Sequence, residues 1–220
     1  MWNTPWRVAM FFLSATSIWC LLAEFYGLCS MRTFTFAILF PATALIFILA
    51  ALDWRSGDRT LARWVLIGAG AGLLAAVAYD IFRLPFVFAK DMGIEGVVPA
   101  MPLFKVFPRF GALIMGEPVE QPHYSLATQL VGWAYHFSNG ITFGIMYLAL
   151  IGDSLKRSWI WGVVLAVGLE LGMLFTPYTS FFGIKMSVTF VVVTLVAHFI
   201  FGVALGLCTR SFARRWVLAI

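Results

Sequence analysis

Two histidines occur in the same short pattern inside apolar stretches of the chain. The pattern is His-Phe-x-x-Gly-x-x-x-Gly, and it begins at His136 and again at His198. The first copy lies in the segment GWAYHFSNGITFG, which also contains Asn139. An ionisable side chain is costly in hydrocarbon, so a histidine within an apolar helix indicates a functional site. Its occurrence in two copies of one pattern strengthens this hypothesis.

An acidic residue lies on the apolar stretch that precedes each histidine. Asp80 is followed by Pro85, and Glu170 is followed by Pro177. At 1.5 Å of rise per helical residue, Glu170 and the two histidines fall at overlapping depths in the outer half of the membrane. Asp80 lies nearer the outer surface, with Arg83 three residues further along. The sequence therefore predicts a cluster of acids and histidines that opens outward.

Metal binding is the first function that these residue types indicate. Imidazole and carboxylate groups are ligands for zinc, iron, copper and manganese. The predicted metal ligands are His136, His198, Glu170 and Asp80. In an enzyme, the metal would activate water or oxygen for hydrolytic or redox chemistry, Glu170 or Asp80 would act as the base, and Arg83 would bind an anionic head group. Four further groups could join this cluster: Glu24, Glu117, Glu120 and His123.

A b-type haem is the second choice of cofactor. Haem iron is held by axial ligands, and His136 and His198 would occupy both axial positions. The glycines of the repeated pattern would leave room for the macrocycle. Asn139, one turn from His136, completes the set of residues predicted to bind a cofactor.

Two other classes of function stay open at this level. The acids and histidines could relay protons or cations in a transporter. They could instead hydrogen-bond to one another and stabilise an accessory subunit of a larger membrane complex. If the protein is an enzyme, an apolar site within the bilayer favours a lipid, a quinone or another hydrophobic small molecule as the substrate.

The composition places all these residues in a membrane protein. Of the 220 residues, 62% are hydrophobic and only 11% are charged, whereas soluble domains carry about 25% charged residues. The net charge of +5 comes from basic residues that cluster in short loops. That distribution is typical of membrane topology, so nucleic-acid binding is not expected.

Six apolar segments are long enough to be transmembrane helices in a single all-α polytopic domain, 1–220. The predicted spans are 8–28, 34–52, 64–82, 126–151, 159–177 and 186–208. With six spans, nine of the fifteen Lys and Arg residues fall on one side, which predicts that both termini are cytoplasmic. We expect a bacterial inner membrane as the location.

The spans that carry the acids and histidines form two similar helix pairs. Each pair, 64–82 with 126–151 and 159–177 with 186–208, combines one acid, one histidine and small residues spaced four apart. Such residues let helices approach closely in lipid, so we expect two tandem helix-pair repeats. The first pair carries an additional segment, 83–125, with six prolines and many apolar residues. We expect an interfacial or re-entrant element there, which would act as an outer lid or a structural cap.

Overall fold

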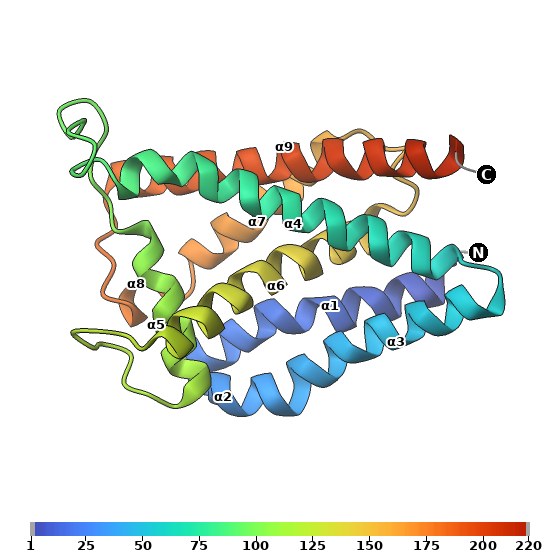
Figure 1. Cartoon of the computed structure of the whole chain (residues 1–220), viewed down its shortest axis with the longest axis horizontal. Helices are drawn as coiled ribbons and strands as arrows, with labels where there is room; N and C mark the ends of the chain where they lie inside the picture. The colour runs from blue at the N-terminus through green and yellow to red at the C-terminus, as the bar shows by residue number, and fades with distance from the viewer. Residues whose placement is uncertain (1–2, 219–220) are drawn as a thin grey trace.

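The computed structural model describes residues 3–218 and contains, within that range, helices and connecting loops but no β-strand. The helices form an elongated bundle (Figure 1). The long helices are α1 (Thr4–Phe25), α3 (Phe40–Ser56), α4 (Thr60–Val87), α6 (Leu126–Ile151), α7 (Ile160–Leu174) and α9 (Val188–Leu218). The short elements are α2 (Met31–Phe34), a π-helix (Thr35–Leu39), a 3-10 helix (Leu103–Lys105), α5 (Val106–Met115) and α8 (Tyr178–Phe181).

Four helical segments are long and apolar enough to cross a membrane, which indicates a membrane protein. They are Thr4–Phe25, Met31–Ser56, Thr60–Val87 and Val188–Trp216. Two of the six predicted spans do not meet both criteria. The α6 helix has 26 residues, but polar residues such as His136 and Asn139 lower its hydropathy, and α7 is apolar but has only 15 residues.

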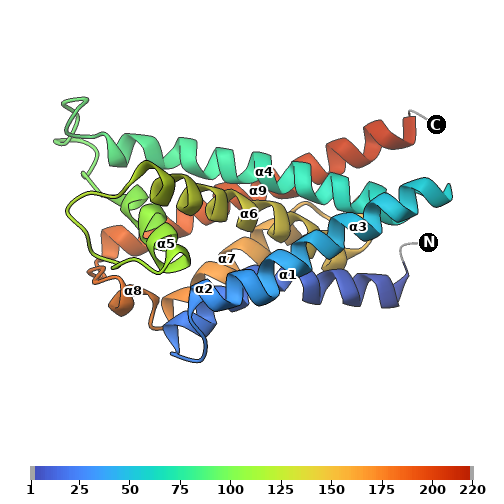
Figure 2. The same cartoon turned by 60° about the horizontal axis from the view of Figure 1, so that its bottom comes forward.

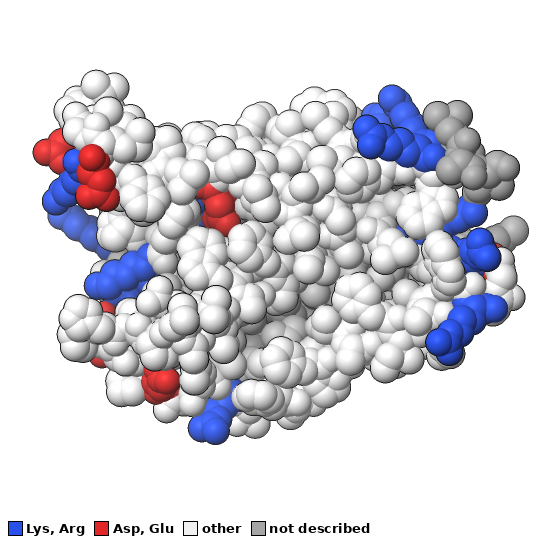
Figure 3. All heavy atoms as spheres, in the orientation of Figure 1, with Lys and Arg blue, Asp and Glu red and all other residues white. Residues whose placement is uncertain are grey.

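The charged residues support this interpretation. On the face drawn in Figure 3, Lys, Arg, Asp and Glu gather at the two ends of the molecule. An almost uncharged band separates them, as expected for a surface in contact with hydrocarbon. The start of α1 and the end of α9 lie at the same end of the bundle (Figures 1 and 2). The α3–α4 and α6–α7 loops lie at that end too.

Helix boundaries agree with the predicted spans to different degrees. The α6 helix has the predicted limits, 126–151, whereas α4 extends past the predicted end at 82 to Val87 and contains Pro85. A proline removes one backbone hydrogen bond and crowds the preceding turn, and Pro85 lies in the last turn of α4, two residues before the helix ends. The α9 helix continues beyond 208 through much of the basic tail to Leu218.

Glycines allow the helices around the site to pack closely. The α4 helix packs against α6 and α9, and α7 packs against α9. A Cβ atom added at Gly72 of α4 would lie 2.0 Å from the carbonyl oxygen of Gly140 in α6. A Cβ atom added at Gly162 of α7 would lie 2.4 Å from the carbonyl oxygen of Gly202 in α9. Any side chain at these positions would push the helix axes apart.

The proline-rich segment folds back onto the bundle. Its longest helix, α5, has 10 residues and packs against α6. The contact is backbone to backbone, because a Cβ atom at Gly111 would lie 1.9 Å from the carbonyl oxygen of Thr128. Phe107 and Phe110 of α5 are buried in a cluster with Leu21 of α1. After Val87 the segment forms no helix longer than α5, and it lies at the end of the bundle opposite the start of α1 (Figure 1).

Candidate functional site

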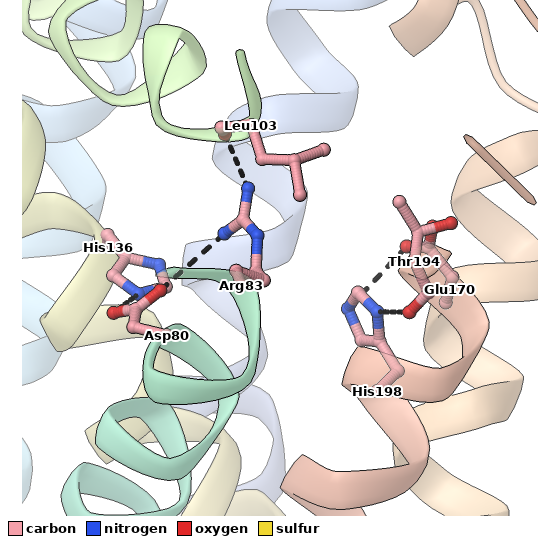
Figure 4. A network of polar contacts seen from close by, with 7 residues as sticks. All are labelled: Asp80, Arg83, Leu103, His136, Glu170, Thr194 and His198. Atoms are coloured by element: carbon pink, nitrogen blue, oxygen red, sulfur yellow. Dashed lines mark hydrogen bonds and ion pairs between the residues drawn. The ribbon is translucent and has the colours of Figure 1, made fainter. Parts of the chain in front are cut away.

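The first His–carboxylate pair joins α4 to α6. Nε2 of His136 lies 2.8 Å from Oδ2 of Asp80, and the close approach of Gly72 to Gly140 brings the two helices near enough for this contact. When Asp80 is a carboxylate, which only accepts hydrogen bonds, Nε2–H is the donor. The neutral ring then carries its lone pair on Nδ1, which points away from Asp80 in Figure 4.

Arg83 connects this pair to the proline-rich segment. Its Nη1 lies 3.5 Å from Oδ1 of Asp80, and its Nη2 donates a hydrogen bond to the carbonyl oxygen of Leu103. The guanidinium also lies 4.7 Å from the centre of the Tyr79 ring and 5.2 Å from that of Phe107. These contacts fix a buried cation beside the carboxylate, since only 5% of Arg83 is exposed.

The second pair joins α7 to α9. Nε2 of His198 lies 3.5 Å from Oε2 of Glu170, and Nδ1 lies 2.9 Å from the carbonyl oxygen of Thr194. A carbonyl oxygen only accepts, so Nδ1–H is the donor, and a neutral ring would present a lone pair to the carboxylate. Two lone pairs repel each other. The contact is therefore favourable only when the pair holds one further proton, either on His198 or on Glu170.

Tyr79 separates the two pairs. The centre of its ring lies 6.0 Å from that of His136 and 4.9 Å from that of His198, and Figure 4 shows the pairs on opposite sides of the site. The part of the chain that the structure describes contains no group of three or more His, Cys, Asp and Glu side chains able to hold a metal ion. The predicted metal site therefore gains no support from the geometry.

An inner chamber of about 140 Å³ lies between the two pairs. His136, His198, Glu170 and Asn139 line it, together with apolar side chains from α1, α4, α5, α6, α7 and α9. Oδ1 of Asn139 is buried and has no hydrogen-bond partner among the described residues. The chamber thus offers His136, His198, Glu170 and one free acceptor to an apolar molecule, whereas Asp80 contacts His136 but does not line the chamber.

An outer chamber of about 400 Å³ adjoins the inner one. Five residues line both chambers: Tyr79, Arg83, Val106, Glu170 and Tyr178. Tyr178 belongs to the short α8 helix, and desolvation by the surrounding protein raises the pKa of its phenol well above the usual value. Its hydroxyl therefore stays a neutral hydrogen-bond donor at the junction of the two chambers.

The other predicted ligands lie outside the inner chamber. Glu24 accepts a hydrogen bond from the backbone N–H of Met31 at the start of α2. Glu117 accepts one from Thr128 at 2.8 Å, and Glu120 lies 2.5 Å from Arg109. His123 is exposed in the loop before α6. None of these four acids and histidines lines the inner chamber.

The structure adds residues to the site that the sequence analysis did not select. Tyr79 lies between the pairs, and Phe107 stacks on His136 with ring centres 4.2 Å apart. Arg109 and Lys105 of the proline-rich segment line the outer chamber. For Tyr79, the one signal in the sequence is its position next to Asp80. The others depend on how the proline-rich segment folds.

Comparison of the chain with protein-family models, with curated proteins and with solved structures finds no match. Inference about function therefore depends on the geometry and chemistry of the two pairs and the two chambers.

Proposed function

We propose that the protein is a membrane-embedded enzyme that moves protons on a hydrophobic substrate by general acid–base catalysis. One observation carries this proposal: His136, His198 and Glu170 line a single apolar chamber, and each histidine contacts a carboxylate from a neighbouring helix. Enzymes that isomerise or eliminate need one group that accepts a proton and one that donates, both within reach of the substrate.

His136 is the proposed base. Asp80 accepts the Nε2–H hydrogen bond at 2.8 Å, which holds the ring in one tautomer and stabilises the imidazolium that forms when Nδ1 takes a proton. Arg83 and Phe107 restrict the positions of the carboxylate and the ring. Such preorganisation is what a catalytic base needs in a site with little water.

The Glu170–His198 pair is the proposed acid. The substrate loses a proton from one atom to His136, the freed electron pair shifts within the substrate, and another substrate atom takes the proton held by the pair. The substrate is isomerised without an oxidant or a reductant. His136 then releases its proton to solvent and the Glu170–His198 pair takes one up, which returns both pairs to their starting states. The free Oδ1 of Asn139 would accept a hydrogen bond from the bound substrate.

We propose six spans with both termini in the cytoplasm of a bacterium and the site in the outer half of its inner membrane. The start of α1, the end of α9 and the α3–α4 and α6–α7 loops all lie at the same end of the bundle, which supports an even number of crossings. The two further spans in this proposal are α6, which packs against α1, α4 and α5, and α7, which packs against α9.

The tandem repeat is also a proposal. It rests on the similar relation within each helix pair, α4 with α6 and α7 with α9, where a glycine contact is followed by a carboxylate–histidine contact. A duplicated pair would bring two acid–base groups to one chamber, and later divergence would give them different proton states.

A metal ion or a haem would require a different arrangement of these groups. The two pairs lie on either side of Tyr79, so a single ion ligated by His136, His198, Glu170 and Asp80 would need the helices to move together. Metal binding remains a prediction, and metal analysis in the presence of a chelator tests it separately from acid–base catalysis.

Proton-coupled transport is the second candidate function. A third chamber of about 600 Å³ lies between α6 and α7 and shares Leu169 with the inner chamber. Cavities on both sides of a titratable centre are what alternating access needs. Uptake of a solute into proteoliposomes, driven by a proton gradient, would favour this candidate. An accessory role would instead be favoured if the chain purified only together with other membrane subunits.

Hydrogen–deuterium exchange into a substrate tests the enzyme proposal without knowledge of the product. The purified protein is incubated in D₂O with a total lipid extract, and mass spectrometry identifies any molecule that gains deuterium at carbon. We expect exchange with the native protein and with His123→Gln, whose side chain is exposed and outside the chambers, and none with His136→Gln. Exchange that persists in folded His136→Gln would overturn the assignment of the base.

A further inference from the structure

We infer that the outer chamber binds the anionic head group of an amphiphile whose apolar part enters the inner chamber. The inference rests on the proposed function and deepens it, because it names the substrate class of the same site. The shared chemistry of the head group is that of a phosphate or a carboxylate.

Buried arginine nitrogens without hydrogen-bond partners are the first observation. Arg83 is 5% exposed and Arg109 is 8% exposed, and both line the outer chamber. Among the described residues, Nε of Arg83 and Nε of Arg109 have no hydrogen-bond partner, whereas Nη1 of Arg83 faces the Asp80 carboxylate at 3.5 Å. Buried donors in proteins are nearly always paired, so free donors beside a cavity point to a ligand with acceptor atoms.

Both guanidinium groups are held in place by the backbone of neighbouring segments. Arg83 donates to the carbonyl oxygen of Leu103, and Nη1 of Arg109 donates to the carbonyl oxygen of Phe182 at 2.8 Å. The arginines therefore fasten the proline-rich segment and the α8 region around the chamber. A planar guanidinium whose position is already fixed binds a phosphate or a carboxylate at a low cost in side-chain entropy.

The charge of the chamber is the second observation. Four cations line it and one acid does: Arg83, Lys105, Arg109 and Lys185 against Glu170. Asp80 and Glu120 offset part of this charge through Arg83 and Arg109. Glu120 is itself 62% exposed, so solvent screens its contribution. Glu120 also lies 4.0 Å from Lys105. The four cations of the lining still outnumber the three acids in and beside it, Glu170, Asp80 and Glu120, which favours an anion.

The apolar lining of the inner chamber defines the other end of the ligand. An apolar cavity of about 150 Å³ is large enough to bind benzene, and the inner chamber has about 140 Å³. A ring or a short chain therefore fits between the two His–carboxylate pairs. Tyr79, Arg83 and Tyr178 lie where the two chambers meet, so one molecule can occupy both.

Binding of hexyl phosphate to the full-length protein in an uncharged maltoside detergent tests this inference. Isothermal titration calorimetry compares the affinity for hexyl phosphate with the affinities for inorganic phosphate, 1-hexanol and hexyltrimethylammonium. We expect hexyl phosphate to bind at least about tenfold more tightly than each of these, because only hexyl phosphate fills both chambers. Its affinity should also fall as the NaCl concentration rises to about 0.5 M. Equal affinity for 1-hexanol would overturn the head-group site, and equal affinity for inorganic phosphate would show a site for free anions instead.

Variants of the cations identify the chamber. Lys105→Gln and Lys185→Gln change exposed side chains, so these proteins should fold, and we expect each to weaken hexyl phosphate binding by roughly threefold to tenfold. Lys90→Gln is the matched control, because Lys90 is exposed in the loop after α4 and does not line the chamber. Arg109→Gln should have a larger effect. Identical affinities for the two lysine variants and the control would contradict the inference.

The result is separable from the enzyme proposal. Hexyl phosphate binding without any deuterium exchange in the lipid extract would leave the head-group site in place and remove the acid–base function. Deuterium exchange confined to uncharged molecules, together with no hexyl phosphate binding, would support the acid–base function and remove the head-group site.

Discussion

His198 donates a hydrogen bond from Nδ1 to the carbonyl oxygen of Thr194, one turn earlier on α9, at 2.9 Å. This backbone contact decides what the opposite nitrogen can do. Nε2 faces Glu170, and a proton must lie on one of the two groups for their contact to be favourable. The hydrogen bond to Thr194 therefore determines that the Glu170–His198 pair holds a proton that it can donate.

The first prediction concerns this proton. In protein labelled with ¹⁵N at histidine, we expect the Nδ1 resonance of His198 to be that of a protonated nitrogen throughout the neutral pH range. Glu170→Gln should keep this tautomer, because the introduced carboxamide has an N–H that can donate to Nε2. His198→Gln assigns the signal. Observation of a neutral ring protonated at Nε2 would contradict the proposed acid.

The second prediction separates stability from catalysis at the first pair. Asp80→Asn should lower deuterium exchange by roughly 10²–10⁴-fold, because a carboxamide can present an N–H to Nε2 and favour the other tautomer of His136, and it lacks the charge that stabilises the imidazolium. It should also destabilise the protein by about 3–5 kcal/mol, since buried Arg83 loses its counter-ion. Both are measured on the same preparation, by mass spectrometry and by thermal unfolding in detergent.

A double variant is the control for that prediction. Asp80→Asn combined with Arg83→Gln removes both charges, so stability should recover in part while exchange stays low. If exchange recovers together with stability, Asp80 acts only through folding, and its proposed role in orienting His136 is wrong.

The sequence predicts the contacts within each His–carboxylate pair better than it predicts how the two pairs are arranged. Spacing of four residues along helices predicts which acid can meet which histidine, because Gly72, Asp80, His136 and Gly140 must share a contact face. The spacing does not predict whether the two pairs meet in one cluster. That depends on the rotation of α4 about its axis, which places Tyr79 between the pairs.

The outer chamber shows why some site residues have no local signal. Arg109 reaches it because α5 packs on α6 through Gly111 and because Phe182 offers its carbonyl oxygen. Prolines in the segment 83–125 predict interruption of a span, but they do not determine the path of the chain. That path is decided by long-range packing of aromatic residues such as Phe107.

The third prediction concerns helix packing around the second pair. Gly162→Ala should destabilise the protein by about 1–3 kcal/mol, because the added Cβ atom would lie 2.4 Å from the carbonyl oxygen of Gly202. The resulting shift of α7 should also separate Glu170 from His198. Thermal unfolding in detergent measures the first effect, and the ¹⁵N spectrum of His198 reports the second.

A matched control lies on the same helix. A Cβ atom added at Gly168 would meet nothing within 4 Å, so Gly168→Ala should be neutral or should stabilise the protein by about 0.5–1 kcal/mol. Equal destabilisation by the two substitutions would show that the close α7–α9 contact is absent in solution.

The fourth prediction tests the role of metal ions. Acid–base catalysis by His136 and the Glu170–His198 pair should continue after dialysis against a chelator. The metal hypothesis instead expects a stoichiometric ion, measured by elemental analysis, that is lost in the His136→Ala, His198→Ala double variant together with exchange. A Soret absorption band would favour haem. Retention of exchange in metal-free native protein rules out a catalytic requirement for the ion.

The fifth prediction tests the proposed topology with the cysteine at the α1–α2 turn. Cys29 is partly exposed and belongs to the turn between α1 and α2, which lies at the end of the bundle opposite the start of α1 (Figure 1). A membrane-impermeant maleimide should therefore label it in cells whose outer membrane has been made permeable. Ser56→Cys places a thiol at the end of α3, where labelling should require disruption of the inner membrane. Cys29→Ser gives the background for both. The reverse pattern would place the termini outside, and labelling of both thiols in intact inner membranes would show that the segment between them does not cross the bilayer.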